Sequence, residues 1–281
     1  MDGASATAEY SVFADTMADM TYPEVAEAAR NGAIVLWGLG VIEQHGPHLP
    51  LGTDVYIPSA VLRRARALLA ERGRASVIVP PFYWGVNAVT GQFPGTFHVR
   101  AEVMTEVLLD VYASLKKDGF DNVFCLSGHG DIAHIRTIHA AAQLGRTRLG
   151  IASAILVTPS VEARLTGGTP DSSVVVMRAT GEAPAKFLDI HAGEWETSQI
   201  WATYPALIRQ NVARALKSTD LGASDLEIWR RGAEHARRTT PDGYFGNPAA
   251  ADPERGQRQL EQQALAVAEA VMARRDAEAK R

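Results

Sequence analysis

The chain has 281 residues, a formal net charge of −4 at pH 7 and a sequence pI of about 6.1. Hydrophobic residues make up 46% and charged residues 21%, which is the balance of a folded globular protein and excludes a disordered or fibrous one. Without an excess of positive charge, binding to nucleic acid or to an anionic membrane surface is not expected. The single cysteine, Cys125, lies in an apolar run and predicts a reduced, buried thiol.

The ends and apolar runs of the chain bear on where the protein works. The first twenty residues are acidic and lack the basic-then-apolar order of a secretory signal. No apolar run approaches the roughly 18 to 20 residues that cross a bilayer. We therefore expect a cytoplasmic protein that has no membrane partner and acts on a small-molecule substrate.

Helical patterns alternate with continuous apolar runs through the first 160 residues. The predicted helices cover 22–32, 57–72, 100–118 and 134–144, and the predicted strands cover 33–40, 75–85, 122–128 and 149–159. Fully apolar strands that alternate with helices are typical of a parallel sheet buried on both faces. The sequence therefore predicts a three-layer α/β fold with a mostly parallel sheet and helices on both faces.

The second half of the chain is less regular. Residues 158–189 mix short strand and turn signals, and we interpret them as an insertion near the functional site. A loop then leads into a helix within 191–204, and further helices are expected over 221–239 and 255–281. We expect one domain over residues 1–281, with a motif-bearing core at about 32–203 and a helical C-terminal part at about 204–281.

The most informative segment is IEQHGPHLPLGTD, residues 42–54. It has neither helical nor strand periodicity, and it contains Glu43, His45, His48 and Asp54. In an extended segment Glu43 and His45 leave the backbone on the same side because they are two residues apart. The segment therefore predicts a metal-binding loop.

Two further polar clusters follow predicted buried elements. SGHGD comes directly after the third strand and offers His129 and Asp131, while HAGEWETS offers His191, Glu194 and Glu196 at the start of a helix. In open parallel sheets, ligands bind just beyond the carboxyl ends of the strands. We therefore expect these clusters to meet the 42–54 loop at one site.

The residue types at this site favour a pair of metal ions. Carboxylates and imidazoles without a thiolate suit zinc, manganese or iron(II). The six candidate metal ligands are Glu43, His45, Asp54, His129, Asp131 and Glu196. One catalytic ion needs about three protein ligands, so six candidates favour two ions joined by a carboxylate. Such a pair holds a hydroxide and polarises a carbonyl for its attack, which predicts hydrolysis.

Several of these residues have a second interpretation. His48 either supports the ligands or caps its loop, and Asp131 is equally well placed to be a helix N-cap. Trp84 and Trp195 have the character of core residues, but both lie beside polar loops, where they would line a pocket. The remaining histidines are interpreted as structural: His98, His134, His139 and His235.

Two other motif interpretations fail on their own terms. The segment GLGVIE begins like a dinucleotide-binding fingerprint, but Glu43 stands where the third glycine is required. The segment around Ser127 resembles a serine-hydrolase elbow, but Cys125 replaces its first glycine. Neither NAD binding nor a serine nucleophile is therefore expected.

Four segments in this order, EQHGPHLPLGTD, FPGTFHV, SGHGD and HAGEWETS, resemble the creatininase (creatinine amidohydrolase) family. The resemblance covers about residues 32–203. It implies a layered α/β fold, a binuclear centre of two divalent ions (manganese or zinc, with iron as a further choice) and a homo-oligomer, usually a homohexamer. It also implies a metal-dependent hydrolase.

The resemblance also implies a role for each matching residue. Glu43, Asp54 and His129 would hold one metal, and His45 with the shared Asp54 the other. Either Asp131 or Glu196 would complete the second site. His191 would be the catalytic residue that carries a proton to the leaving group.

Departures from the family pattern bear on the substrate. Ser127, Gly130 and Ile132 replace residues typical of creatininase itself, which argues against creatinine. The segment VNAVTGQ offers Asn87 beside Trp84, and with Trp195 these are the expected substrate-binding residues. We expect C–N cleavage of a small polar, cyclic substrate.

Two alternatives remain open at this point. Relatives in the family hydrolyse cyclic amides, formamides, peptides or the C–C bond of a cyclic polyol diketone in inositol breakdown, and the sequence barely separates the first class from the last. The further alternative is a non-catalytic, metal-stabilised assembly protein. His191 speaks against it, because a purely structural metal site needs no acid or base beside it.

Overall fold

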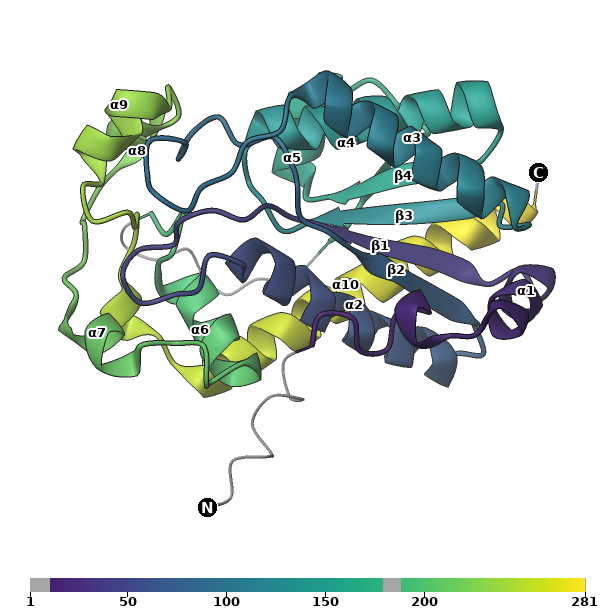
Figure 1. The fold of residues 1–281 in the computed structure, drawn as a ribbon, viewed down its shortest axis with the longest axis horizontal. Helices are drawn as coiled ribbons and strands as arrows, with labels where there is room; N and C mark the ends of the chain where they lie inside the picture. Colours follow the sequence, from purple (N-terminus) through teal and green to yellow (C-terminus); the bar gives the residue numbers. More distant parts are fainter. Residues whose placement is uncertain (1–10, 179–187, 281) are drawn as a thin grey trace, which may run out of the picture.

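The computed structural model describes residues 11–178 and 188–280. Its centre is a sheet of five parallel strands in the order β2-β1-β3-β4-β5 (Figure 1). The strands are β1 (Ile34–Leu39), β2 (Ser76–Phe82), β3 (Asn122–Ser127), β4 (Ala152–Val157) and β5 (Val174–Val176). The expected parallel sheet is confirmed, and two of its neighbouring strands, β1 and β3, are each followed directly by a segment that carries candidate ligands.

Helices cover both faces of this sheet, so the fold has three layers. Figure 1 shows α3 and α4 on one face and α2 and α10 on the other. The longer helices are α1 (Tyr22–Arg30), α2 (Thr53–Glu71), α3 (Ala101–Lys117), α4 (Ile132–Leu144), α5 (Pro159–Thr166), α6 (Glu194–Thr203) and α10 (Pro253–Ala279). Shorter ones are α7 (Gln210–Ala215), α8 (Ala223–Trp229), α9 (Ala233–Thr239), the π-helix η2 (Gly145–Leu149) and the 3-10 turns η1 (Met17–Asp19) and η3 (Pro248–Ala250).

The apolar character of β1 follows from its position between two cores. Alternate side chains of a strand point to opposite faces. Ile34 and Leu36 therefore join the core beneath α2, α6 and α10, while Val35 and Trp37 join the core beneath α3 and α4. Every residue of β1 is buried, as expected for a central strand of a parallel sheet.

Three expectations from the sequence change in detail. Helix α2 begins at Thr53 instead of residue 57, so Asp54 lies in its first turn. The helix expected over 221–239 is two helices, because Gly232 between them adopts a φ of +72°. The region interpreted as an insertion contains α5 and the fifth strand, and its residues 179–187 lie outside the described part of the chain.

Membrane insertion has no support from the helices. In the described ranges, none of them combines the length and the apolar character that crossing a bilayer requires.

Helix α10 holds α6 at an unusually short distance. A Cβ built on Gly256 of α10 would lie 2.0 Å from the carbonyl oxygen of Ser198 in α6. The backbone of α10 approaches α6 so closely because Gly256 has no side chain. At the same end of α10, the Asp252 N–H donates to the Ser198 hydroxyl at 3.0 Å. The position of α6 therefore depends on this contact.

Replacing Gly256 by alanine tests this contact. In an ordinary helix the change would stabilise by about 0.5–1 kcal/mol, but here the new methyl group collides with the Ser198 carbonyl, and overpacking costs about 1–3 kcal/mol. We expect Gly256→Ala to lower Tm by roughly 2–8 °C in a thermal melt. The exposed neighbour Gln257 is the control, and Gln257→Ala should leave Tm unchanged. Equal melting of both variants would contradict the close approach.

Candidate metal centre

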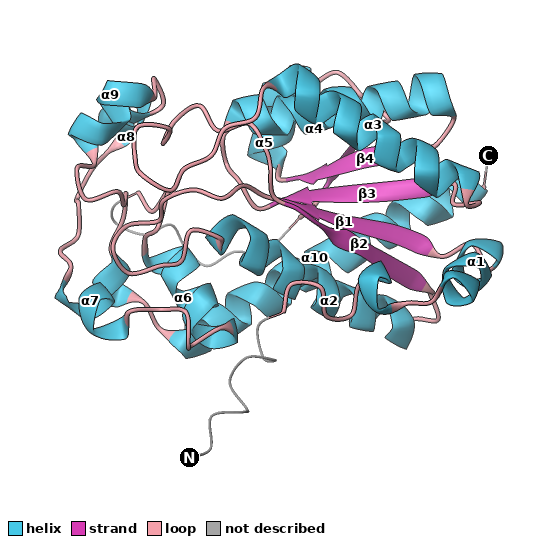
Figure 2. Cartoon of the chain, viewed as in Figure 1, coloured by secondary structure: helices cyan, strands magenta, loops and turns pink. Residues whose placement is uncertain are grey.

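The candidate ligands lie in loops at one end of the sheet. Figure 2 shows these loops gathered beyond the carboxyl ends of the strands. Glu43 and His45 follow β1, and His129 follows β3. Asp54 and Glu196 lie in the first turns of α2 and α6, where the partial positive charge of a helix N-terminus favours a carboxylate.

Two glycines allow Asp54 to reach the ends of β1 and β3. A Cβ on Gly40 would lie 2.2 Å from the Asp54 carbonyl oxygen, and a Cβ on Gly128 would lie 2.0 Å from it. The N–H of Gly128 donates to Leu39 O at 2.9 Å, which ties the two strand ends together. The start of α2 is thus seated directly on the edge of the sheet, and any larger residue at either glycine would displace it.

The first group of ligands consists of Glu43, Asp54 and His129. His129 Nδ1 lies 3.1 Å from Glu43 Oε1 and 3.0 Å from Asp54 Oδ2. All three side chains are buried, and each offers one ligand atom within 4.8 Å of the others. This group has the ligand number that a divalent ion requires.

The second group consists of His45, Asp54 and Glu196. His45 Nε2 lies 3.2 Å from Asp54 Oδ1 and 3.8 Å from Glu196 Oε2. The Ala192 N–H donates to Glu196 Oε2 at 2.5 Å and fixes that carboxylate toward the site. Asp54 therefore belongs to both groups, with one oxygen facing each histidine.

The donor chemistry of these groups fits divalent metal ions. Three carboxylates and two imidazoles are ligands that zinc, manganese and iron(II) accept. Asp54 Oδ2 is buried, and no hydrogen bond of good geometry reaches it from the described residues, although His129 Nδ1 is near. A buried carboxylate oxygen without a donor is costly unless a cation meets it.

The pKa values of these residues also indicate that the site favours positive charge. Burial opposes a charge on His45, but the adjacent Asp54 outweighs it and raises the pKa of His45 to about 9. Against the same burial, Glu43 and Asp54 raise the pKa of His129 well above its usual value. Burial is also the main cause that raises the pKa of Glu196 to about 7. In the absence of metal, protons on the histidines balance the carboxylates.

A layer of buried polar side chains orients the ligands. Asn87 Nδ2 donates to Glu43 Oε2 at 2.7 Å, and the Thr90 hydroxyl donates to the same oxygen. His48 Nε2 lies 2.8 Å from the Thr197 hydroxyl, next to Glu196 in α6. Of the two interpretations of His48, this contact matches that of a residue that supports the ligands. Such contacts fix ligands before any ion binds.

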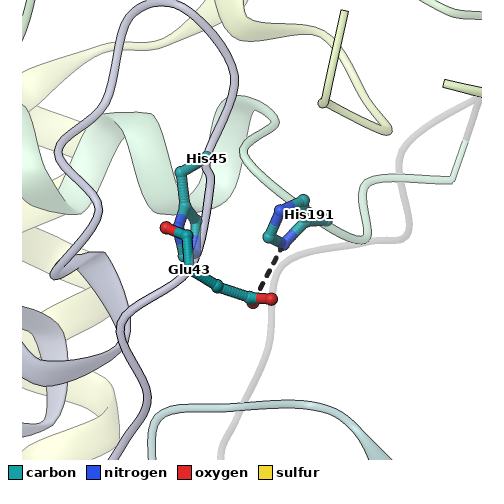
Figure 3. Close-up of side chains that lie close together, drawn as sticks. All are labelled: Glu43, His45 and His191. Carbon is teal, nitrogen blue, oxygen red and sulfur yellow. Dashed lines mark hydrogen bonds and ion pairs between the residues drawn. The ribbon is translucent and has the colours of Figure 1, made fainter. Parts of the chain in front are cut away.

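His191 lies against the first group and is held from behind. Figure 3 shows its ring facing the Glu43 carboxylate, with His191 Nδ1 3.7 Å from Glu43 Oε1. Its Nε2 lies 2.8 Å from the Gln44 carbonyl oxygen, which only accepts hydrogen bonds. The Gln44 amide nitrogen lies 3.1 Å from the same ring nitrogen. With the proton on Nε2, the ring donates to the closer carbonyl oxygen, and Nδ1 then presents its lone pair to the site. Burial and the charge of His45 lower the pKa of His191 to about 4.

Asp131 is engaged with backbone groups. Its Oδ1 accepts from Ala133 N at 2.8 Å and caps α4, and its Oδ2 accepts from Ala88 N at 2.8 Å. Among the described residues, the three groups with metal-ligand spacing do not include it. A third such group joins Glu43, His45 and His191.

A cavity of about 200 Å³ opens above the ligands. Five of its lining residues are expected site residues, namely Glu43, Asp54, His129, Asp131 and Glu196, and a sixth is His191. Six further lining residues are not among the expected site residues: Val89, Thr90, Arg164, Ile190, Trp229 and Arg230. No local signal marks them, because they come from α5, α8 and loops far apart in the chain.

The two tryptophans predicted to bind the substrate do not line this cavity. Trp84 is 46% exposed and packs edge-on against Phe97, outside the lining of this cavity. Trp195 is 39% exposed and lines a second, larger cavity that shares His129 and Gly130 with the first.

Comparison with known proteins gives a family and a fold. The model of the family described as "Creatininase: Creatinine amidohydrolase" matches residues 18–271. A crystal structure of creatinine amidohydrolase (creatininase) superposes with a TM-score of 0.70 at 22% sequence identity, covering 92% of this chain and 96% of that one.

Two sequence relatives have different activities. The chain is 29% identical over 228 residues to the mycofactocin precursor peptide peptidase of Mycobacterium ulcerans (strain Agy99), covering 80% of this chain and 78% of the relative. It is 26% identical over 196 residues to the 3-dehydro-scyllo-inosose hydrolase of Thermotoga maritima, covering 69% of this chain and 58% of the relative.

Gly128 and Gly130 form a matched pair for testing whether the close backbone contact at Gly128 holds Asp54 in position. We expect Gly128→Ala to push the Asp54 backbone away and weaken metal binding about 10–100-fold, as loss of ligand support does. Nothing lies within 4 Å of a Cβ on Gly130, so Gly130→Ala should retain metal. The measurement is metal content after dialysis against a buffered metal concentration. Full metal retention in Gly128→Ala would contradict this account of Asp54.

Proposed function

The chain belongs to the creatininase family, whose members are metal-dependent hydrolases, and from this membership we propose that it hydrolyses a C–N bond of a small polar substrate at a binuclear metal centre. One observation carries the proposal. Asp54 belongs to two ligand groups at once, one with Glu43 and His129 and the other with His45 and Glu196. A carboxylate shared in this way is what a two-metal site requires.

We assign the ligands to two metal sites. Glu43, Asp54 and His129 would hold one ion, and His45, Asp54 and Glu196 the other. Manganese and zinc are the ions we expect, with iron as a further choice. When bound, such a pair of ions lowers the pKa of water and polarises a carbonyl group.

The remaining polar residues support these ligands. Asn87 and Thr90 hold Glu43 from behind, so we assign Asn87 to positioning a ligand instead of contacting substrate. Because backbone N–H groups occupy both of its oxygens, Asp131 is assigned to capping α4, and Glu196 completes the second site.

His191 is the group that we assign to proton transfer. Its Nδ1 lone pair faces the ligands, and its Nε2–H is held by the Gln44 carbonyl. A neutral imidazole in this position accepts a proton at Nδ1 and delivers it to the departing nitrogen. Trp229 closes the other side, with its ring centroid 5.8 Å from that of His191.

We further propose a substrate class and an assembly. A cyclic amide remains our expected substrate, and a linear amide shares its chemistry. Ring opening by C–C cleavage is the second candidate, supported by the similarity to the Thermotoga maritima hydrolase. A homo-oligomer is supported by the exposed aromatic pair of Trp84 and Phe97, whose side chains pack on each other at the surface.

Removing the metal should affect both stability and turnover. A ligand present at 100 times its dissociation constant stabilises a fold by about 2.7 kcal/mol, and without ions the buried carboxylates repel one another. We expect dialysis against a chelator to lower Tm and abolish hydrolysis, and manganese or zinc to restore both. Turnover that persists in chelated, metal-free protein would contradict the proposal.

Replacing His191 separates chemistry from metal binding. We expect His191→Ala to keep two ions per chain and the fold while kcat falls by roughly 10²–10⁴-fold, the typical contribution of a general acid or base. His235 is exposed and lines neither of the two cavities, so His235→Ala is the matched control and should keep full activity. If His191→Ala turns over at the rate of the control, the proton-transfer role is wrong.

The bond that is cleaved follows from product masses. The purified enzyme should be incubated with cyclic amides, formamides, short peptides and keto-inositols in the presence of manganese or zinc. We expect mass spectrometry to show water added across a C–N bond. Products of C–C cleavage alone would favour the second candidate. A chain that is fully loaded with metal but transforms none of these classes would favour a non-catalytic, metal-stabilised assembly protein.

A further inference from the structure

Two guanidinium groups line the cavity above the candidate metal centre. Arg164 lies in the last turn of α5, and Arg230 lies at the C-cap of α8. The two residues are far apart in the sequence, yet both side chains line the same volume of about 200 Å³ as Glu43 and His191. They interact with each other as like charges, since Arg164, together with burial, lowers the pKa of Arg230.

Neither guanidinium has a counter-ion in the described part of the chain. The ion pairs and side-chain hydrogen bonds between described residues do not include Arg164 or Arg230, although Glu227 contributes a favourable charge to Arg230. The carboxylates that share the cavity are already engaged. Asp131 accepts from two backbone N–H groups, and Glu196 accepts from Ala192 N.

Interaction with helix dipoles explains only part of the placement of Arg164 and Arg230. A basic residue near a helix C-terminus interacts favourably with the helix dipole, and both arginines occupy such positions. That explanation would be satisfied with the two side chains pointing apart into solvent. It does not account for two like charges that line one cavity while neither forms an ion pair with another described residue.

The exposure of the lining residues increases from the inner end of the cavity, its floor, to its outer end, its rim. On the floor, Glu43 is 1% exposed and Asp54 is 2% exposed, while Arg164 and Arg230 are exposed at the rim. Beside Arg230, Trp229 lies against His191 and walls the space between rim and floor. A substrate that fills the cavity therefore meets the ligand groups at one end and the two arginines at the other.

The two arginines decide the sign of the charge in the cavity. In the proposed two-metal state, two divalent ions are balanced by the four carboxylates that line the cavity, Glu43, Asp54, Asp131 and Glu196, with neutral histidines. The two guanidinium groups then leave the loaded cavity with a net positive charge, which attracts anions. Arginine in particular binds planar, two-oxygen anions through paired N–H donors.

We propose that Arg164 and Arg230 bind an anionic group of the substrate, a carboxylate or a phosphate, while its scissile carbonyl lies at the metal ligands. The position of the scissile carbonyl rests on the proposed hydrolase function, whereas the anion site rests on the cavity alone. It narrows the substrate class from small polar molecules to anionic ones.

The test compares anionic and neutral probes in direct binding. Metal-loaded protein is titrated, with ligand-observed NMR as the readout, against N-acetyl amino acids as free acids and as their amides, and against glycerol 1-phosphate and glycerol. We expect the wild type to prefer one anionic probe over its neutral partner by about tenfold or more, the size of a charged hydrogen bond. Arg164→Gln and Arg230→Gln should each lose most of this preference.

Arg231 supplies the control. It is the exposed neighbour of Arg230 and does not line the cavity, so Arg231→Gln should keep the full preference. Which probe pair shows the effect distinguishes a carboxylate from a phosphate. Anion binding that is equal in wild type, Arg164→Gln and Arg230→Gln would mean that the anion sits on the metal alone, and it would overturn the inference. An absence of anion preference in the wild type would also overturn it.

The binding readout needs no turnover, so failures of the two proposals can be told apart. If the anion preference depends on the arginines but no amide is hydrolysed, the anion site stands and the hydrolase assignment fails. If anionic amides such as N-acetyl amino acids are hydrolysed with the same KM by wild type, Arg164→Gln and Arg230→Gln, the hydrolase stands and the anion site fails.

Discussion

The site depends on the close packing of the Asp54 backbone against the ends of two neighbouring strands, β1 and β3. Helix α2 starts one residue before Asp54, and its first turn touches the sheet because Gly40 and Gly128 present no side chain there. The backbone contact fixes where the carboxylate can point. Its two oxygens then face His45 on one side and His129 on the other. A packing contact between backbone atoms thus sets the geometry of a chemical centre.

Without a bound cation, the grouping of these buried carboxylates costs electrostatic free energy. Asp54 offers a ligand atom within 4.8 Å of one on Glu43 and within 4.8 Å of one on Glu196, in a buried region where the dielectric constant is low and repulsion is strong. Helix N-termini, the Asn87 amide and protonated histidines each offset part of this cost. None of them removes it, which is the usual condition of sites that are stabilised by the cation they bind.

The sequence predicted the parts of the molecule whose signals are local. Buried parallel strands are continuous apolar runs, and the ligands of the 42–54 loop are close in sequence, so both could be recognised without a structure. Arg164 and Arg230 could not, because only tertiary packing brings α5 and α8 to one cavity. Gly232 breaks a helix through a left-handed φ that helical periodicity does not reveal. Asp131 had two equally good interpretations, and only the positions of its backbone donors separate them.

The close approach of α10 to α6 has a consequence for how the protein is made. Glu196 is carried by α6, and α6 is held by a glycine contact from Gly256, which follows every proposed metal ligand in the chain. During synthesis, the segments with Glu43, Asp54 and His129 emerge from the ribosome well before α10 does. The first ligand group can therefore assemble on a nascent chain, whereas the second waits for the last helix. A chain interrupted before α10 would lack the contact that positions α6, and with it the fixed place of Glu196 in the second ligand group.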